Sequence, residues 1–461
     1  MTDHGEPRAG PEEASTALSR TMAGQVAGLV DHDVRLCGWV EAVVEDGDVP
    51  LLVLRDPTGF AVLRPDPAND RLVAEVAALR RESAVEAEGR VVIAEPTVDM
   101  PAVGSASTAG SEQVVLHRLS VVGPAVAELP IDDRTPVDQR LDWRFIDLRR
   151  PRNRLIFEVQ TTVEHAMREV WRAEGFVELH SPKFRPTPNK SGSELFTVEY
   201  FGRKAYLAQS PQFYKQMAMA SGLDRIFEIG PVFRANPLVT SRHDTEFTSV
   251  DVEMSWIESH HDVMGFEERW LRHVLEVVRE THGDDIARWF GAEVTVPEVP
   301  IPRVHMADAH KILEAASHQV TGKKEGDLDA EGERLVARHV MRERGHEFVF
   351  VTDYPEWIRP YYHMRSADDP TRTRSFDLLW KGLEVTTGAQ REHRPDVLAA
   401  QASARGVPLG PIEFYLDFFR FGCPPHGGFG LGLTRFLMSL LDVDDVRQVT
   451  YLHRGPNRIN P

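Results

Sequence analysis

Gly427-Gly428-Phe429-Gly430-Leu431-Gly432-Leu433-Thr434-Arg435, near the end of the 461-residue chain, is the stretch that says most about the fold. Side chains alternate between the two faces of a strand, so Gly428, Gly430 and Gly432 leave one face bare, against which a flat nucleotide can lie. The apolar run 436–441 predicts a helix after the strand, with Arg435 at the junction. Taken alone, this stretch also fits a glycine-rich turn in any α+β enzyme.

A second region predicts a long antiparallel hairpin from segments 227–234 and 242–254, joined by a polar loop. Its returning strand separates apolar side chains on one face from mostly polar ones on the other: Val250, Val252 and Met254 against Phe247, Ser249, Asp251 and Glu253. This alternation is typical of a sheet that is packed on one side. The cations Arg234, Arg242 and His243 surround the loop and suit a triphosphate, because arginine binds phosphate oxygens in bidentate fashion. A solvated hairpin tip is the alternative.

With two further stretches, these regions resemble the aspartyl-tRNA synthetase family, in particular its archaeal and eukaryotic branch, within the class II aminoacyl-tRNA synthetases. The stretches are Gln209-Ser210-Pro211-Gln212-Phe213-Tyr214-Lys215-Gln216 and Gly382-Leu383-Glu384-Val385-Thr386-Thr387-Gly388-Ala389-Gln390-Arg391. The resemblance runs over 141–461 and includes 350–355, 375–379 and 424–428. It implies an α+β fold, in which an antiparallel catalytic sheet flanked by helices follows a small β-barrel, the OB-fold that reads the tRNA anticodon.

Composition shifts divide the chain. We expect a polar tail over 1–25, an OB-fold-like domain over 26–130, a charged linker over 131–140 and the catalytic domain over 141–461. Short β-rich runs with turn signals between them, such as 34–40 and 51–56, support the barrel.

Cys37 and Cys423 show neither metal spacing nor a disulfide framework, which favours a reducing cytoplasm. Residues 1–15 lack the apolar core of a signal peptide, and no run approaches the roughly 20 apolar residues of a membrane span. We expect a soluble protein without membrane contacts. The pair His260-His261 lies in a polar segment and is predicted to be solvated.

A helix is predicted over 157–174, because apolar residues recur at helical spacing and Gly175 can act as a C-cap. The recurring residues are Val163, Met167, Val170 and Trp171. The following segment, 177–182, resembles the strand that forms the dimer interface of class II enzymes together with this helix. The resemblance therefore implies a homodimer.

Activation joins two anions, since the carboxylate of an amino acid attacks the α-phosphorus of ATP, and cations must dominate the site. Arg234 and Arg435 are the expected catalytic residues, with Arg234 bridging carboxylate and α-phosphate. Phe247 and Arg435 would sandwich the adenine, and Glu384 with Thr387 would hold Mg²⁺. The expected ATP-binding set is Arg234, Arg242, His243, Asp244, Phe247, Glu384, Gly432 and Arg435.

Substrate choice is assigned to Lys215 and Arg391, with Asp251 orienting the lysine. Two cations favour L-aspartate, because an amide cannot satisfy buried charges. The expected aspartate-binding set is Gln212, Lys215, Arg234, Asp251, Thr387 and Arg391. Salt bridges of Lys215 and Arg391 that serve no ligand are the alternative.

The chain departs from the family pattern at several positions. Lys190 stands where the family carries a glutamate that binds the α-ammonium group of the substrate, while Asn236 and Thr434 stand where it carries acids. In the small domain, acidic residues follow Gly38-Trp39-Val40 in place of basic ones, and Val62 replaces an expected glutamine. Residues 1–130 hold 10 arginines, no lysine and 21 acids, a net charge of −11, whereas tRNA phosphates favour a basic surface.

Three functions remain open at this point. The first is an aspartate–tRNA ligase that uses ATP and Mg²⁺. The second is a tRNA-independent ligase that adenylates aspartate or a related acid and passes it to an amine. The third is a non-catalytic sensor of ATP or aspartate, which Arg234, Glu384 and Arg435 disfavour because all three are present.

Overall fold

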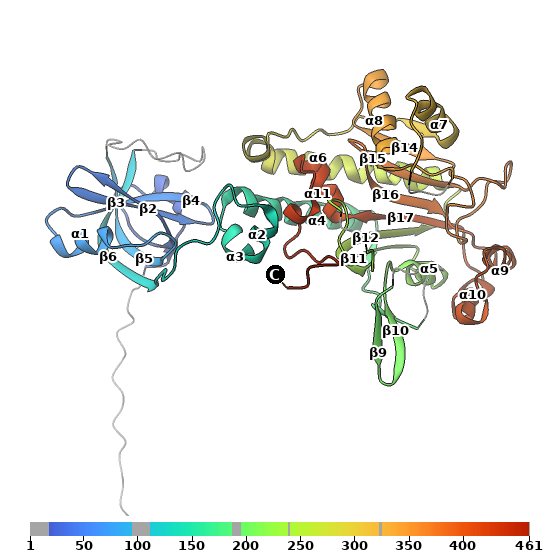
Figure 1. Ribbon diagram of the computed structural model, residues 1–461, viewed down its shortest axis with the longest axis horizontal. Helices are drawn as coiled ribbons and strands as arrows, with labels where there is room; N and C mark the ends of the chain where they lie inside the picture. Colours follow the sequence, from blue (N-terminus) through green and yellow to red (C-terminus); the bar gives the residue numbers. More distant parts are fainter. Residues whose placement is uncertain (1–17, 95–110, 187–194, 238–239, 322–324, 461) are drawn as a thin grey trace, which may run out of the picture. The chain divides into compact units, whose positions relative to one another are not determined.

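The computed structural model of the protein describes residues 18–94, 111–186, 195–237, 240–321 and 325–460. The chain divides into two compact units, Met1–Asp132 and Asp133–Pro461, each with its own hydrophobic core (Figure 1). Across the described ranges, no helix combines the length and the apolar character needed to cross a bilayer.

The small unit is a closed β-barrel. Its strands pair in the order β2-β3-β4-β6-β5, and β5 pairs back to β2, which closes the ring. The barrel confirms the predicted OB-fold type of architecture. The elements of this unit are β1 (Arg20–Thr21), η1 (Ala23–Gly28), β2 (Asp33–Asp46), β3 (Val49–Asp56), β4 (Gly59–Pro65), α1 (Asp70–Ala77), β5 (Ala84–Ile93) and β6 (Glu112–Gly123).

The large unit is built on an eight-stranded sheet of order β13-β14-β15-β16-β17-β12-β11-β7. The six strands from β14 to β11 are antiparallel, and β13 and β7 pair parallel at the two edges. The predicted antiparallel catalytic sheet is thus confirmed. The strands are β7 (Val177–Glu178), β11 (Arg225–Phe233), β12 (Glu246–Ser255), β13 (Arg303–His305), β14 (Phe348–Thr352), β15 (Ser375–Trp380), β16 (Leu383–Gln390) and β17 (His426–Gly432).

A separate three-stranded sheet and a set of helices complete the large unit. The small sheet comprises β8 (Phe184–Arg185), β9 (Thr197–Tyr200) and β10 (Arg203–Leu207). The helices are α2 (Val137–Asp142), α3 (Arg144–Asp147), α4 (Pro151–Ala173), α5 (Gln212–Ala220), α6 (His260–Phe290), α7 (Met306–Ala315), α8 (Ala330–Arg344), α9 (Pro395–Ala404), η2 (Gly410–Ile412), α10 (Glu413–Arg420), α11 (Leu433–Leu441) and α12 (Val446–Val449).

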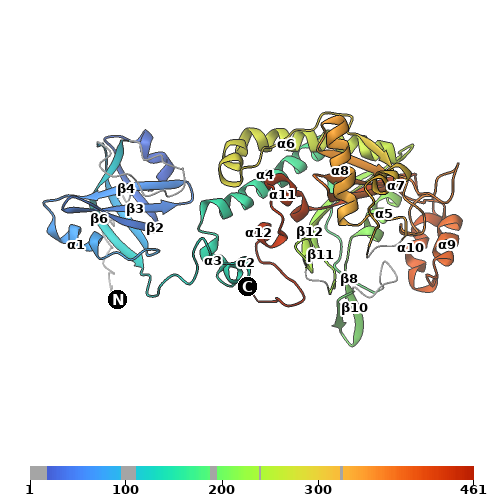
Figure 2. The same ribbon diagram turned by 45° about the horizontal axis from the view of Figure 1, so that its top comes forward.

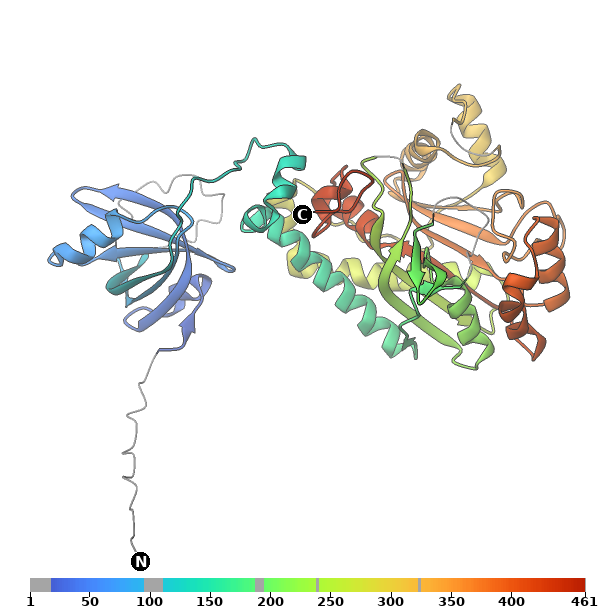
Figure 3. The same cartoon turned by 60° about the horizontal axis from the view of Figure 1, so that its bottom comes forward.

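The long helices α4 and α6 run together along one face of the large sheet (Figures 2 and 3). Their contact with the sheet is aromatic: the Trp171 and Trp270 ring centroids lie 5.6 Å apart, and Trp270 stacks on Phe429 of β17 at 5.9 Å. All three side chains are fully buried. Because one face is closed in this way, the opposite face is left for the polar side chains of β12 and β16.

Two local predictions need correction. Helix α4 begins at Pro151, six residues before the predicted start, because proline is favoured in the first turn of a helix, where its missing N–H has no partner to lose. Gly175 follows the helix with a φ of 84°, as its predicted capping role requires.

The prediction that His260 is solvated is wrong. It lies in the first turn of α6 on the buried side, whereas His261 is exposed.

The predicted hairpin is formed by β11 and β12, and β17 pairs on the other side of β12. Val250 and Val252 are buried in the core, together with Phe429 and Leu431 of β17. Close pairing of the two strands depends on glycine at 428. A Cβ built there would lie 2.0 Å from the Val252 carbonyl oxygen, a distance that real structures do not show.

We therefore expect Gly428→Ala to lower the free energy of unfolding by about 3 kcal/mol, because β17 must move away from β12. The control is Gly432→Ala on the same strand, where the nearest atoms to a new Cβ are 3.8 Å away. It should change stability by less than about 1 kcal/mol. Denaturant unfolding of both variants measures this, and equal losses would contradict the close approach at 428.

Candidate functional site

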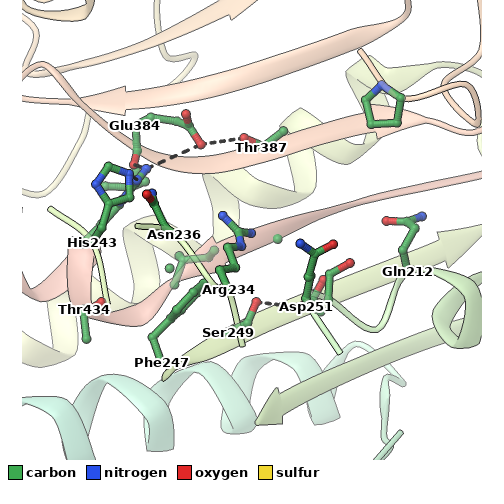
Figure 4. Close-up of a pocket in the computed structure, with 18 of the residues that line it drawn as sticks. Gln212, Arg234, Asn236, His243, Phe247, Ser249, Asp251, Glu384, Thr387 and Thr434 are labelled. Atoms are coloured by element: carbon green, nitrogen blue, oxygen red, sulfur yellow. Dashed lines mark hydrogen bonds and ion pairs between the residues drawn. The ribbon is translucent and has the colours of Figure 1, made fainter. Parts of the chain in front are cut away.

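A cavity of about 440 Å³ opens on the polar face of the large sheet, a size typical of small-molecule sites (Figure 4). It is lined by the β11–β12 hairpin, α5, β16, β17 and the start of α11. The predicted site residues that line it are Gln212, Lys215, Arg234, Arg242, His243, Asp244, Phe247, Asp251, Glu384, Thr387, Arg391, Gly432 and Arg435. The remaining one, Lys190, lies outside the described residues.

A β-bulge brings Glu384 and Thr387 to the same face. Residues three apart on a regular strand point to opposite faces. Here the pairing with β15 shifts, since Leu379 pairs with Glu384 and Leu378 with Thr386, so Val385 has no partner on β15 and the alternation of faces is offset by one residue. As a result, the Thr387 hydroxyl donates a 2.8 Å hydrogen bond to Glu384 Oε1 within the cavity. Thr386 points the other way and donates to the buried Glu267 of α6.

Arg234 lies in the middle of the cavity in the view of Figure 4, between Phe247 and the pair formed by Glu384 and Thr387. Its guanidinium carbon is 5.1 Å from the centre of the Phe247 ring. The predicted adenine sandwich between Phe247 and Arg435 stays a prediction. In this structure Arg234, which follows β11 directly, stacks over that phenylalanine.

The other cations at this end are held by carboxylates. Arg435 lies 3.8 Å from Glu384 Oε1 and 3.5 Å from His243 Nε2. Arg242 is paired at 3.4 Å with Glu333 of α8, a partner that the sequence did not indicate. Together with Arg234, these two residues place three guanidinium groups around one space, which suits a polyanion.

Asp244 has a different environment from the other residues predicted to bind ATP. It is buried, and it accepts hydrogen bonds from His453 Nδ1 at 2.5 Å and from the Thr450 hydroxyl at 3.4 Å. The backbone N–H of the next residue, Thr245, donates to the Arg454 carbonyl. Asp244 thus ties the hairpin loop to the C-terminal segment, although it also lines the cavity.

At the opposite end, Lys215 and Arg391 are both buried. The Nζ atom of Lys215 lies 3.2 Å from Asp251 Oδ1 and 3.1 Å from Glu253 Oε2, and it donates to the carbonyl oxygens of Phe429 and Val252 at 3.1 and 3.4 Å. The ammonium group therefore has four oxygen neighbours for its three hydrogens. Asp251 does contact the lysine that it was predicted to orient.

Glu253 bridges the two cations. Besides Lys215, it accepts from Arg391 Nε at 2.9 Å and from Nη2 at 3.3 Å. Burial by itself would raise the pKa of Glu253, but the charges of Arg391 and Lys215 lower it to about 2. With Asp251, these four side chains carry a formal charge of zero. The sequence placed Glu253 on the correct strand face but did not indicate that it would join the two cations.

An irregular segment before β15 supplies further lining residues that sequence reasoning missed: Arg359, Tyr362 and His363. Arg359 pairs with the buried Asp377 at 2.7 Å. Because this segment lacks strand or helix periodicity, no pattern indicated which side chains face the cavity. Asn236 and Thr434, the two positions where acids were expected, also line it.

We expect Glu253→Gln to destabilise the protein by about 3 kcal/mol at pH 7, because it leaves a buried positive charge uncompensated. The folded pKa of about 2 lies below the ordinary value of 4.5, so the ionised carboxylate stabilises the fold above pH 4.5 and this contribution is lost as the pH falls toward 2. The difference in the free energy of unfolding between wild type and Glu253→Gln should therefore become smaller as the pH falls from 4.5 toward 2. Denaturant unfolding at a series of pH values measures this difference. The control is Glu276→Gln, at a half-exposed side chain, whose free energy of unfolding should stay within about 0.5 kcal/mol of the wild type. A difference in the free energy of unfolding that does not change with pH would contradict the role of the ionised Glu253 carboxylate.

Comparison with known proteins agrees with this geometry. Residues 136–454 match the class II tRNA synthetases (D, K and N). The chain is 39% identical over 444 residues to the aspartate–tRNA(Asp/Asn) ligase of Aeropyrum pernix, covering 94% of this chain and 96% of that protein. It is 37% identical over 434 residues to the aspartate–tRNA(Asp) ligase of Pyrococcus abyssi, covering 93% and 96%.

The solved structure of asparaginyl-tRNA synthetase from Pyrococcus horikoshii, complexed with asparaginyl-adenylate, has the same fold. The TM-score is 0.87 at 29% identity, and the match covers 96% of this chain and 100% of that one. The resemblance inferred from the motifs is confirmed: the chain belongs to the class II tRNA synthetases of the D, K and N group.

Proposed function

We propose that the protein is an aspartate–tRNA ligase, which forms aspartyl-adenylate from L-aspartate and ATP and transfers the aspartyl group to tRNA. The observation that carries this proposal is one cavity with cationic side chains at both ends. Arg234, Arg242 and Arg435 surround one end, and Lys215 and Arg391 are buried at the other. Curated relatives that share almost the whole length of the chain are aspartate–tRNA ligases.

In the first step, a carboxylate oxygen of aspartate forms a bond to the α-phosphorus of ATP, and the bond to pyrophosphate breaks. Arg234, in the middle of the cavity, would hold the carboxylate and the α-phosphate together. Arg242 and Arg435 would stabilise the negative charge that moves onto pyrophosphate. In the second step, a terminal hydroxyl of tRNA attacks the activated carbonyl and releases AMP.

Glu384 and Thr387 fit a magnesium ion that arrives with the nucleotide. A carboxylate and a hydroxyl, 2.8 Å apart and facing the same cavity, are hard oxygen donors, and Mg²⁺ often takes only one or two protein ligands beside phosphates and water. When bound, the ion would neutralise phosphate charge. In this structure the Thr387 hydroxyl donates to the Glu384 carboxylate, and Arg435 lies close to the same oxygen.

Recognition of the aspartate side chain would use Lys215 and Arg391 in a formally neutral cluster. The 3.4 Å contact from Lys215 to the Val252 carbonyl is long, so a substrate carboxylate can take that hydrogen without breaking a good bond. An asparagine amide would bring its own donors to a place already filled with donors. Gln212, on the first turn of α5, lies at the same end and would hold a polar group of the amino acid.

The small barrel would bind the anticodon region. Residues 1–130, which comprise the N-terminal tail and the barrel, carry a net charge of −11, which is unusual for an RNA-binding region and favours the second candidate, a tRNA-independent ligase that passes the activated acid to an amine. The substitution of Lys190 for an acid points the same way. A sensor without catalysis is disfavoured, because the cations needed for adenylation all line the cavity.

The relatives carry both kinds of name, aspartate–tRNA(Asp/Asn) ligase and aspartate–tRNA(Asp) ligase, so the proposal covers charging of tRNA for aspartate with or without tRNA for asparagine. We also propose a cytoplasmic location, because Cys37 and Cys423 are both free thiols, which are typical of a reducing compartment.

A homodimer is part of the proposal. Strand β7 is an edge of the large sheet, and its Val177 is exposed. Near it in sequence, Phe184, Tyr200 and Phe201 form a chain of ring contacts on the small sheet, and Phe201 is 88% exposed. Figures 1 and 2 show the β9–β10 hairpin projecting from its unit. Exposed aromatic side chains and an open strand edge are both typical of interaction surfaces, and a second copy would cover them.

Aspartate-dependent ATP–pyrophosphate exchange, followed by charging of total tRNA, tests the activity. We expect both reactions in the wild type, and loss of aspartate activation by on the order of 100-fold or more in Arg391→Leu, with ATP binding retained. Arg394→Leu is the matched control, since that side chain is exposed close to the same strand. Equal loss of ATP and aspartate binding in Arg391→Leu would remove the specificity assignment. Exchange without charging of tRNA would support the second candidate.

Sedimentation equilibrium tests the dimer. The wild type should have twice the chain mass of 51.9 kDa, and Phe184→Glu combined with Phe201→Glu should give the monomer mass, because charges cannot be buried unpaired in an apolar contact. Phe421→Glu, at a side chain that is 90% exposed after α10, should stay dimeric. A dimer in the double variant would place the interface elsewhere.

A further inference from the structure

His363 lies where the irregular segment before β15 passes the end of β16. Its backbone forms an isolated antiparallel bridge with Arg391, and its Nε2 atom lies 3.1 Å from Arg391 Nη1. The side chain is buried, and it lines the cavity together with Arg391. A guanidinium group has no acceptor, so the imidazole nitrogen accepts this hydrogen bond and must be unprotonated.

Arg391 has five N–H groups, and the hydrogen bonds given by the described residues use four of them. Nε donates to Glu253 at 2.9 Å, Nη2 to Glu253 at 3.3 Å and to the Gly428 carbonyl at 2.9 Å, and Nη1 to His363. One N–H, on Nη1, is left for a ligand. The imidazole therefore fixes the nitrogen from which the substrate contact would come.

The acceptor is also neutral. A carboxylate in the same place would add a second negative charge beside Arg391, and the cluster of Lys215, Arg391, Asp251 and Glu253 would become anionic and repel an acidic substrate. An apolar side chain would leave Nη1 without its partner. A neutral imidazole holds the guanidinium without changing the charge of the pocket.

The backbone of this segment is itself anchored. Gln401 of α9, which is buried, donates from Nε2 to the carbonyl oxygens of Tyr361 and His363 at 2.7 and 3.3 Å. The N–H of Glu392 donates to the Tyr362 carbonyl. The segment around His363 is therefore anchored to α9 and to the residues that follow β16.

We propose that His363 is a positioning residue for the amino-acid substrate: by accepting from Arg391 Nη1, it orients the one remaining N–H of that arginine toward the side-chain carboxylate. The assignment deepens the proposed function and rests on it. In this role His363 affects the binding of aspartate and leaves the binding of ATP unchanged.

The test is ATP–pyrophosphate exchange with separate variation of aspartate and ATP, in the full chain, for the wild type, His363→Leu and His363→Gln. We expect KM for aspartate to rise by about 10- to 100-fold in His363→Leu, the usual effect of losing a hydrogen bond to a charged group. KM for ATP should change by less than about twofold. His363→Gln should stay within about threefold of the wild type for both substrates, because its amide oxygen can accept the same bond.

His339→Leu, a half-buried histidine of α8 in the same unit, is the control for replacing an imidazole and should leave both KM values unchanged. Thermal unfolding checks that each variant is folded, and His363→Met replaces the leucine variant if that one is not. Equal rises for aspartate and ATP, or a glutamine variant as poor as the leucine variant, would overturn the assignment. An unchanged KM for aspartate in His363→Leu would refute His363 alone, whereas no aspartate-dependent exchange in the wild type would refute the proposed function as well.

Discussion

A carboxylate buried in the middle of a sheet needs cationic partners, and Glu253 has two, Lys215 and Arg391. This interaction joins α5, β12 and the end of β16, and Arg391 extends it to β17 through the Gly428 carbonyl. The polar end of the cavity is therefore built from groups that stabilise each other before any ligand binds.

The shape of the cavity follows from two features of the backbone. Glycine on β17 allows the strand to lie close to β12, and the bulge at Val385 turns Glu384 and Thr387 to the same side. Both features act on a sheet whose other face is closed by α4 and α6. The aromatic contacts there leave little freedom for the strands, so the polar side chains above them are held at fixed spacings.

The hairpin and the glycine-rich strand could be predicted, because period-2 alternation and glycine spacing are local properties of strands, and Asp251 was assigned to the polar face of its strand in this way. Arg234 was expected among the cations around the hairpin loop, and most other site residues, such as Lys215 and Glu384, were expected from the resemblance to the family. The burial of His260 was predicted wrongly, since a polar sequence neighbourhood does not say which side of a helix meets the core. His363 and Arg359 could not be found, because they lie on an irregular segment whose path is set by tertiary contacts.

We propose that the cavity selects aspartate through a neutral cluster in which one N–H of Arg391 is left for the ligand. Calorimetric titration with non-hydrolysable analogues of aspartyl-adenylate and asparaginyl-adenylate tests it most directly, since both fill the nucleotide end equally. We predict that the aspartyl analogue binds on the order of 100-fold more tightly, because the amide replaces an acceptor oxygen with a donor where Lys215 and Arg391 both donate. Equal affinities, or tighter binding of the asparaginyl analogue, would contradict the account.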